Sequence, residues 1–450
     1  MSDDKPIRSE GGSERAGSGH DEITGFLLRR PFLSEVDRAI AQASTQELGK
    51  LWLGVVSLPK LRHVNAALGF DAGDNLLREV AAIMQKELPE AFAMGRLEGG
   101  DLALASFGPV KRLSRRSAPE AEAKFLGNTV QTLGSHIFMS VRAGICQYRA
   151  PDDAAECLRK TQLALVRARD EAGGDLRYYT DDMGQLAETR ARLVRELLPA
   201  IESDALTLQY QPQIDLKTGA LVGVEALVRW PQPDGSFISP AEFIPIAERS
   251  ELIVPLGDWV LRKACEQAAY WRGSGLPPFH VAVNVSPVQF YKTDLVTTVR
   301  SLLAETNLEP NWLELELTEG AVMGDGDESL LVLRQLRELG IELAIDDFGT
   351  GYSSLSYLKR FPVQRLKIDQ SFVRNSHENA DDRAITRTII AIGKNLDMKV
   401  LAEGAETSDH IQFLASEGCD EAQGYYYARP LDAEVVADFV RSRPPAGASH

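Results

Sequence analysis

Cysteine is scarce in this chain, with four among 450 residues, at Cys146, Cys157, Cys265 and Cys419. The four are widely scattered, so they show neither the close pairing of a zinc site nor the density of a disulfide framework. We therefore expect ordinary reduced thiols, which are typical of a cytoplasmic protein.

Long apolar runs are absent as well. No stretch of the sequence approaches the roughly 20 apolar residues of a membrane helix, and the first residues, MSDDKPIRSEGGSERAGSGH, lack the apolar core of a secretion signal. Basic residues are outnumbered, because 49 Lys and Arg face 65 Asp and Glu and leave a net charge of −16. Nucleic-acid binders and binders of anionic membranes rely on basic surfaces, so we expect neither kind of partner. A small phosphorylated ligand in a local pocket remains compatible with this charge.

The length of the chain predicts two or more domains, since one hydrophobic core seldom serves so many residues. We expect a disordered tail over residues 1–19, an α/β domain over 20–180 and a linker helix over 181–203. A second domain is expected over 204–441, followed by a flexible tail over 442–450.

Strand-like and helix-like segments alternate through residues 204–441. Eight short β-rich runs are LTLQYQPQIDL, LVGVEALVRW, HVAVNVSP, WLELELTE, IELAIDDFG, RLKID, KVLAEGAE and AQGYYYARP. Amphipathic helical stretches such as TDLVTTVRSLLAET, LLVLRQLRELG and DDRAITRTIIAIGKNL separate most of them. This alternation predicts an α/β fold of the (β/α)8 TIM-barrel type, with a doubly wound open sheet as the alternative. The link KTGA is too short for a crossover helix, so the first two strands should be antiparallel.

Polar side chains recur where these strands are expected to end. They are Glu225, Arg229, Asn284, Glu316, Glu319, Asp346, Asp347, Lys367, Glu403 and Gln423. A lone Asp-Asp pair more often caps a helix or solvates a loop. In a barrel, however, the carboxyl ends of the strands meet at one rim, where chemistry takes place. The excess of carboxylates over lysine favours divalent cations at this rim.

The ordered motifs YQPQIDL, EALVRW, FIPIAE, NVSP, ELTE, DDFGTGYSSL, LKID, AEGAE and AQGYYYARP make the second half resemble an EAL-domain cyclic di-GMP phosphodiesterase. The resemblance implies hydrolysis of cyclic di-GMP to linear pGpG, with two Mg²⁺ or Mn²⁺ ions. It also implies a homodimer formed through the EAL domain. Magnesium and manganese suit an all-oxygen set of ligands, whereas zinc usually recruits His or Cys.

The resemblance also assigns roles to single residues. The implied metal ligands are Glu225, Asn284, Glu316, Asp346, Asp347 and Glu403. The implied catalytic set is Lys367, Glu225, Glu403 and Gln423, with Lys367 beside the attacking water as its orienter or its proton acceptor. We favour the orienter, because a general-base lysine needs a depressed pKa and neighbouring carboxylates oppose one. The implied substrate-binding residues are Gln211, Leu227 and Arg229. A loop with Gly349, Thr350 and Gly351, held by Glu319, is implied to couple metal binding to the dimer interface.

The first half is similar to a GGDEF diguanylate cyclase domain, an α/β fold with a central antiparallel sheet. The similarity rests on HDEITGFLLRR, ALGFDAGDNLLREVA and GRLEGGDLALASF. Gly99, Gly100 and Asp101 keep the start of the signature motif, but Leu102 and Ala103 replace its acidic and aromatic residues. Ser57 stands near the expected metal-binding Asp, and EAFA replaces the Arg-x-x-Asp of the inhibitory product site. Too few hard ligands remain to neutralise a triphosphate, so cyclase activity is not expected.

Several alternatives remain open at this stage. The first half is a candidate GTP-binding regulator, a dimerisation module or a folded spacer. The helix predicted around Leu186, Leu193, Leu197 and Ile201 either packs on its own domain or orients the two domains. A receptor that binds cyclic di-GMP without cutting it, and a dual cyclase and phosphodiesterase, are the alternatives to a phosphodiesterase.

Overall fold

The computed structural model describes residues 19–108, 129–132, 135–138, 141–170, 176–323, 326–350, 358–376 and 379–443. The chain divides into two compact units, residues 1–189 and 190–450. Gly351, which belongs to the predicted loop, lies outside the described residues.

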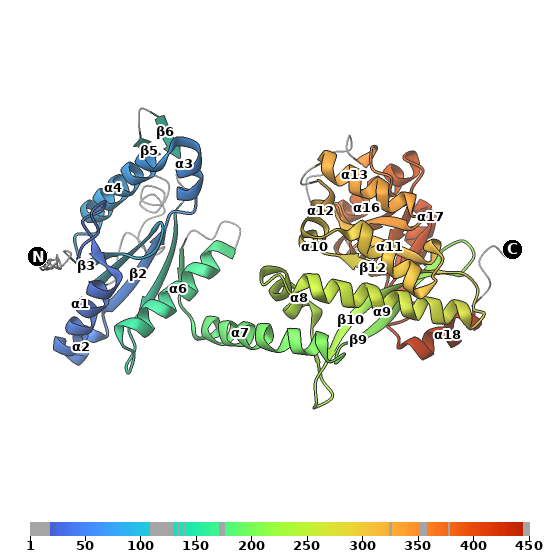
Figure 1. Ribbon diagram of the computed structural model, residues 1–450, viewed down its shortest axis with the longest axis horizontal. Helices are drawn as coiled ribbons and strands as arrows, with labels where there is room; N and C mark the ends of the chain where they lie inside the picture. The colour runs from blue at the N-terminus through green and yellow to red at the C-terminus, as the bar shows by residue number, and fades with distance from the viewer. Residues whose placement is uncertain are drawn as a thin grey trace, which may run out of the picture. The chain divides into compact units, whose positions relative to one another are not determined.

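The first unit contains a six-stranded sheet with the order β1-β3-β4-β2-β7-β8 (Figure 1). Its strands are β1 Leu27–Leu28, β2 Leu51–Ser57, β3 Ala91–Arg96, β4 Asp101–Phe107, β7 Arg142–Gln147 and β8 Leu176–Tyr178. The four central strands pair antiparallel, whereas β1 and β8 lie parallel to their neighbours. The predicted central antiparallel sheet is therefore confirmed. A separate hairpin joins β5 Thr129–Thr132 to β6 Ser135–Phe138.

Helices cover both faces of this sheet. They are α1 Arg29–Gln42, α2 Thr45–Leu48, α3 Leu61–Leu68, α4 Phe70–Glu87 and α6 Ala154–Asp170. The side chains of β4 alternate between the two faces, as in any strand. Leu102 and Leu104 enter the core with α3 and α4, while Ala103 and Ala105 enter the core with α1 and α6. Both faces of β4 are thus buried, and Leu102 serves as a core residue.

The second unit is a closed eight-stranded barrel. Its strands are β9 Thr207–Asp215, β10 Leu221–Pro231, β12 His280–Val285, β13 Leu313–Thr318, β14 Glu342–Phe348, β15 Arg365–Ile368, β16 Lys399–Ala402 and β17 Glu421–Gln423. Strands β10 to β17 pair in parallel in chain order, and β9 closes the barrel antiparallel to both β10 and β17. The modified TIM barrel and its antiparallel first strand are confirmed. A short strand, β11 Phe237–Ile238, forms a hairpin with β10 that the sequence did not indicate.

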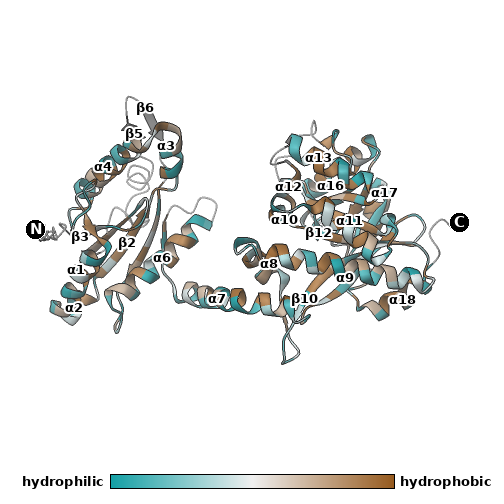
Figure 2. Cartoon of the chain, in the orientation of Figure 1, coloured by the Kyte–Doolittle hydropathy of each residue, from teal (hydrophilic) through white to brown (hydrophobic). Residues whose placement is uncertain are grey.

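Helices surround the barrel strands (Figure 1). They are α8 Pro240–Arg249, α9 Ile253–Gly273, α10 Pro287–Lys292, α11 Leu295–Thr306, α12 Glu319–Met323, α13 Gly326–Glu338, α15 Gln370–Arg374, α16 Ala380–Asn395, α17 Ser408–Glu417 and α18 Ala433–Arg441, with the 3₁₀ turn η2 Pro310–Trp312. The helical patterns expected at 293–306, 330–340 and 381–396 coincide with α11, α13 and α16. Figure 2 shows hydrophobic and hydrophilic segments alternating along α7, α9 and α18, as expected of helices that bury one side.

One helix, α7 Asp181–Glu202, contains the boundary between the two units. Leu193, Leu197 and Ile201 are buried in the core of the barrel unit, whereas Leu186 is 45% exposed. The C-terminal part of α7 therefore packs on the barrel. Across the parts of the chain that the structure describes, none of the helices has both the length and the hydrophobicity needed to cross a membrane.

Candidate active site

A buried lysine lies at the centre of the polar rim of the barrel. The ammonium of Lys367, on β15, is 2.7 Å from Glu316 Oε2, 2.7 Å from Glu403 Oε1 and 3.0 Å from Asp346 Oδ1. Glu225 Oε1 lies 4.0 Å away. These carboxylates come from β10, β13, β14 and the residue after β16. The closed barrel therefore brings together acidic residues that the sequence places up to 178 positions apart, from Glu225 to Glu403.

Amide side chains orient Glu225. Asn284 Nδ2, on β12, donates a hydrogen bond to Glu225 Oε1 over 2.7 Å, and Gln423 Nε2 donates to Glu225 Oε2. Gln423 Nε2 also lies 3.1 Å from Gln211 Oε1 on β9. The side chains of Gln211, Glu225 and Gln423 are each less than 10% exposed, so these amides hold Glu225 in one orientation.

A local irregularity explains how two consecutive aspartates reach the same site. In a regular strand, neighbouring side chains point to opposite faces. The register between β14 and β15 shifts between Ile345 and Phe348, and Asp347 has φ +53°. A bulge of this kind re-aims a side chain. As a result, carboxylate oxygens of Asp346, Asp347 and Glu403 all lie within 4.8 Å of one another.

Burial and mutual repulsion perturb the ionisation of this cluster. Burial raises the pKa of Glu316 well above its usual value, and nearby carboxylates add to that shift although Lys367 opposes it. Burial also raises the pKa of Glu403 to about 8 and that of Asp347 to about 6. For Lys367, burial lowers the pKa, but the surrounding carboxylates outweigh it and raise the pKa well above the ordinary value. The lysine is thus held as an ammonium ion.

The donor set fits divalent cations. Five carboxylates, of Glu225, Glu316, Asp346, Asp347 and Glu403, face one lysine, and two divalent ions would neutralise the remaining charge. Glu316 Oε1 is buried and has no hydrogen-bond partner among the described residues. A buried carboxylate oxygen without a partner is costly unless a cation satisfies it. Oxygen ligands suit Mg²⁺ or Mn²⁺ better than zinc.

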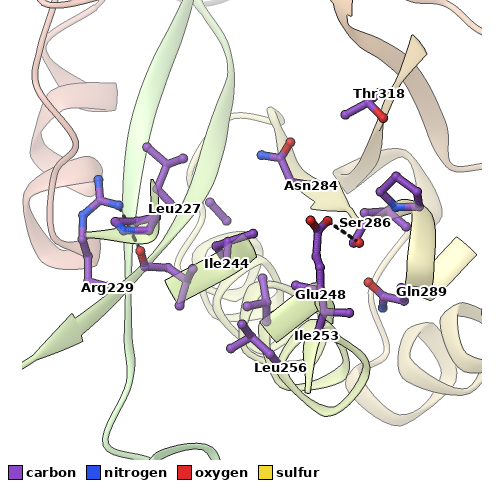
Figure 3. A pocket seen from close by; sticks show the side chains of 17 residues that line it. Leu227, Arg229, Ile244, Glu248, Ile253, Leu256, Asn284, Ser286, Gln289 and Thr318 are labelled. Atoms are coloured by element: carbon purple, nitrogen blue, oxygen red, sulfur yellow. Dashed lines mark hydrogen bonds between the residues drawn. The ribbon is translucent and has the colours of Figure 1, made fainter. Parts of the chain in front are cut away.

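Two cavities adjoin the cluster. The first, of about 280 Å³, is largely apolar and lies between β10, β12 and the helices α8, α9 and α10 (Figure 3). Leu227, Arg229 and Asn284 line it, together with Glu248, which accepts a hydrogen bond from Ser286 Oγ over 2.7 Å. The second, of about 170 Å³, is polar and lined by Gln211, Glu225, Leu227, Asp346, Gln370, Arg374, Glu403, Gly404, Glu406, Gln423, Gly424 and Tyr425. Leu227 belongs to both.

Arg229 is anchored within the first cavity. Its Nε donates to Gln209 Oε1 over 2.8 Å and its Nη1 donates to the carbonyl of Val228 over 3.0 Å. Burial lowers the pKa of this guanidinium, and the charge of Glu225 opposes that shift. These bonds hold a positive group on the same strand as Glu225.

The described start of the predicted loop contacts Glu319. The backbone N–H of Gly349 donates to Glu319 Oε2 over 3.4 Å, and Thr350 Oγ1 donates to the carbonyl of Asp347 over 2.9 Å. Gly349 has φ +100°, a conformation that favours glycine. Glu319 therefore contacts the segment that carries the aspartates.

In the first unit, an arginine lies at the altered signature motif. Arg169, at the end of α6, pairs with Asp101 over 2.9 Å and donates a hydrogen bond to Ser57 Oγ. Ser57 and Asp101 are directly opposite each other on β2 and β4. Gly99, with φ +59°, and Gly100 form the turn before Asp101. A guanidinium thus lies where the resemblance to cyclases expects a metal ion.

Four side chains of the second cavity were not predicted from the sequence. Gln370, Arg374, Glu406 and Tyr425 all line it. One available signal was position, since Gln370 and Arg374 lie on the short helix α15 just after β15, and Glu406 lies in the motif AEGAE. The ion pair between Arg374 and Glu406 could not have been read from spacing, because 32 positions separate the two residues.

Comparison with known proteins agrees with this geometry. The family model of the EAL domain matches residues 194–430, and the model described as "Diguanylate cyclase, GGDEF domain" matches residues 18–174. The bifunctional diguanylate cyclase/cyclic di-GMP phosphodiesterase MucR of Pseudomonas aeruginosa is 36% identical over 420 residues, covering 93% of this chain and 61% of MucR. An uncharacterized protein of Sinorhizobium fredii, y4lL, is 36% identical over 434 residues, covering 96% of this chain and 51% of y4lL.

The chain thus spans between about half and about six-tenths of the length of these two relatives. A solved structure titled "PaMucR Phosphodiesterase, c-di-GMP complex" is 44% identical, with a TM-score of 0.53, and covers 54% of this chain and 99% of that one. The barrel, the clustered carboxylates and both family matches lead to one conclusion: the chain belongs to the EAL domain family, with a GGDEF domain preceding its EAL domain.

Proposed function

We propose that the barrel hydrolyses cyclic di-GMP to linear pGpG with the help of two Mg²⁺ or Mn²⁺ ions. The observation that carries this proposal is the convergence of Glu225, Glu316, Asp346 and Glu403 on Lys367. It is supported by the similarity to a MucR phosphodiesterase solved in complex with c-di-GMP.

Six residues are proposed to hold the ions: Glu225, Asn284, Glu316, Asp346, Asp347 and Glu403. Bound divalent ions supply an activated water and offset charge on the phosphodiester. Before the ions bind, the carboxylates around Lys367 raise its pKa well above the ordinary value and keep it protonated. We assign Lys367 the role of a hydrogen-bond donor that orients the attacking water, and not that of the general base. Gln423 and Asn284 keep Glu225 in position through their hydrogen bonds.

The substrate is proposed to lie across both cavities. Gln211, Leu227 and Arg229 contact it, with Leu227 between the apolar and the polar cavity. The apolar cavity of about 280 Å³ suits a nucleobase, and Arg229 on its wall suits a phosphate oxygen. The polar cavity suits the sugar-phosphate ring near Asp346 and Glu403.

The GGDEF domain is proposed not to synthesise cyclic di-GMP. Leu102 and Ala103 are buried in the two cores of the sheet, and Arg169 occupies the space between Ser57 and Asp101. A guanidinium there opposes a Mg²⁺ ion, which nucleotide triphosphates require for this chemistry. A regulatory or dimerisation role, GTP as a ligand of this domain and a homodimer through the EAL domain stay predictions.

Replacement of Glu225 tests the enzyme assignment. Glu225→Gln keeps the size of the side chain but removes its charge, so release of pGpG with Mg²⁺ or Mn²⁺ should fall by at least about 100-fold. Glu242→Gln, on the exposed side of α8, is the matched control and should keep full activity. Full activity of Glu225→Gln would refute the assignment.

The two other functions give different results in the same assays. A receptor would bind cyclic di-GMP and leave it uncut with both metals. A dual enzyme would form cyclic di-GMP from GTP in the Glu225→Gln background, and such product would show that Arg169 and Leu102 do not prevent synthesis.

A further inference from the structure

The polar cavity has a strongly acidic wall. Glu225, Asp346, Glu403 and Glu406 line it, and among the described lining residues Arg374 alone is basic. Two divalent ions would neutralise the part of the wall near Asp346 and Glu403. Glu406 lies outside the proposed ligand set, so an anion on that side of the cavity needs a separate positive group.

The fold places Arg374 at this cavity. Arg374 ends α15, which follows β15 directly and begins where Asp369 Oδ1 accepts the N–H of Ser371 over 3.0 Å. Gly404 makes a close approach possible, because a Cβ on Gly404 would lie 2.7 Å from Gln370 Cβ and 3.6 Å from Arg374 Cγ. The start of the Arg374 side chain therefore lies against the backbone that follows β16.

Arg374 forms an ion pair with Glu406 that a bound anion can displace. Its Nε donates a hydrogen bond to Glu406 Oε1 over 3.0 Å, and its Nη2 lies 2.9 Å from the same oxygen. The two side chains are 46% and 38% exposed, so water competes with this pair and its net stability is small. A phosphate offers two oxygens to the planar guanidinium and binds it more strongly than one shared carboxylate oxygen.

We propose that Arg374 binds the second phosphodiester of cyclic di-GMP, the one that is not cut, by exchanging Glu406 for that phosphate. This inference rests on the proposed function of the same site. A cyclic dinucleotide carries two phosphodiester charges, and each cavity has one guanidinium among its described lining residues, Arg229 in the first and Arg374 in the second. Arg374 is thus a specificity residue that distinguishes a substrate with two phosphodiesters from one with a single phosphodiester.

Two variants and two substrates test this role in the full-length chain. The substrates are cyclic di-GMP and bis(p-nitrophenyl) phosphate, which has one phosphodiester. In Arg374→Ala, KM for cyclic di-GMP should rise about 10–100-fold while kcat changes less than about threefold. The ratio of kcat/KM on cyclic di-GMP to that on bis(p-nitrophenyl) phosphate should fall by at least about tenfold.

Glu406→Gln separates substrate binding from a structural ion pair. Both variants break the pair with Glu406, but Glu406→Gln leaves Arg374 charged and removes one negative charge from the cavity. KM for cyclic di-GMP should therefore fall about 3–10-fold in Glu406→Gln. The proposal is overturned if KM for cyclic di-GMP rises in both variants. It is also overturned if Arg374→Ala lowers kcat/KM by the same factor on both substrates.

Binding measurements separate this inference from the proposed function. If the wild-type chain binds cyclic di-GMP without cutting it, the dissociation constant should rise in Arg374→Ala and fall in Glu406→Gln, as predicted for KM. That result would support the role of Arg374 and reject hydrolysis. A wild-type chain that neither binds nor cuts cyclic di-GMP would overturn both proposals.

Discussion

The end of the barrel opposite the active site contains a buried ion cluster whose removal should be costly. Arg365 begins β15 and its side chain is 5% exposed. Its Nη1 pairs with Glu314 and its Nε lies 2.8 Å from Glu421 Oε2, and these two glutamates are 0% and 1% exposed. Glu342, at the edge, lies 3.5 Å from Nη1. We predict that Arg365→Met strongly destabilises the barrel.

The magnitude follows from burial. Removing one partner of a buried ion pair costs about 3–5 kcal/mol, because the remaining charge stays out of water. Here Glu314 loses its arginine and Glu421 keeps only the exposed Lys399 at 3.8 Å, so we expect a loss of about 3–5 kcal/mol in the free energy of unfolding of the barrel. The matched control is Arg262→Met. Arg262 pairs with Glu305 over 2.6 Å, but these side chains are 48% and 53% exposed, so its loss should stay below about 1 kcal/mol.

Urea unfolding of the full-length chain, followed by tryptophan fluorescence, measures this difference. Trp52 belongs to the first unit, so all variants are made in a Trp52→Phe background. The remaining four tryptophans are then all in the barrel unit, at Trp230, Trp259, Trp271 and Trp312. The midpoint should shift with little change in the slope m, which scales with the surface exposed on unfolding.

The predicted cause of this loss is the charge of the two carboxylates that Arg365 leaves behind. Adding Glu314→Gln and Glu421→Gln to Arg365→Met removes the unpaired charges, so at least half of the lost stability should return. If Arg365→Met costs no more than Arg262→Met at equal m, the two buried carboxylates do not depend on Arg365 and the argument fails.

Further predictions concern a tight contact and a buried imidazole. Gly144→Ala should destabilise the first unit by about 1–3 kcal/mol, because a Cβ would lie 2.3 Å from the carbonyl oxygen of Thr161 and 2.4 Å from the nitrogen of Leu165. Gly49→Ala is the control, because its Cβ would meet no atom closer than 3.8 Å. Hydrogen exchange of peptides from residues 19–170 measures the stability of both variants, and equal protection in the two would contradict the prediction. Burial lowers the pKa of His280 well below 6.5, so the unfolded chain takes up a proton that the folded barrel does not. The contribution of His280 to the free energy of unfolding is present above about pH 6.5 and falls by about 1 kcal/mol on going to about pH 5.5. In urea unfolding, His280→Gln should remove this part of the pH dependence. An unchanged slope of the free energy of unfolding against pH would disprove the prediction.

Much of the fold could be predicted from local pattern. The alternation of short β-rich runs with amphipathic helices indicated eight strands, and the short link KTGA indicated that the first of them is antiparallel. The positions of polar residues at strand ends then indicated one shared rim, since parallel strands in a barrel end on the same side. Glu225, Asp346, Lys367 and Glu403 do lie within reach of one another there.

Contacts between distant residues could not be predicted in this way. The bulge that brings Asp346 and Asp347 to one site, the ion pair of Arg374 with Glu406 and the contact of Arg169 with Asp101 all depend on strand register and helix placement. The period of the hydrophobic pattern and the sequence motifs indicate which face of a helix or strand a residue occupies. A hydrogen bond, however, requires atomic positions accurate to a fraction of an ångström. Those positions arise only when strands far apart in the chain pair and the barrel closes.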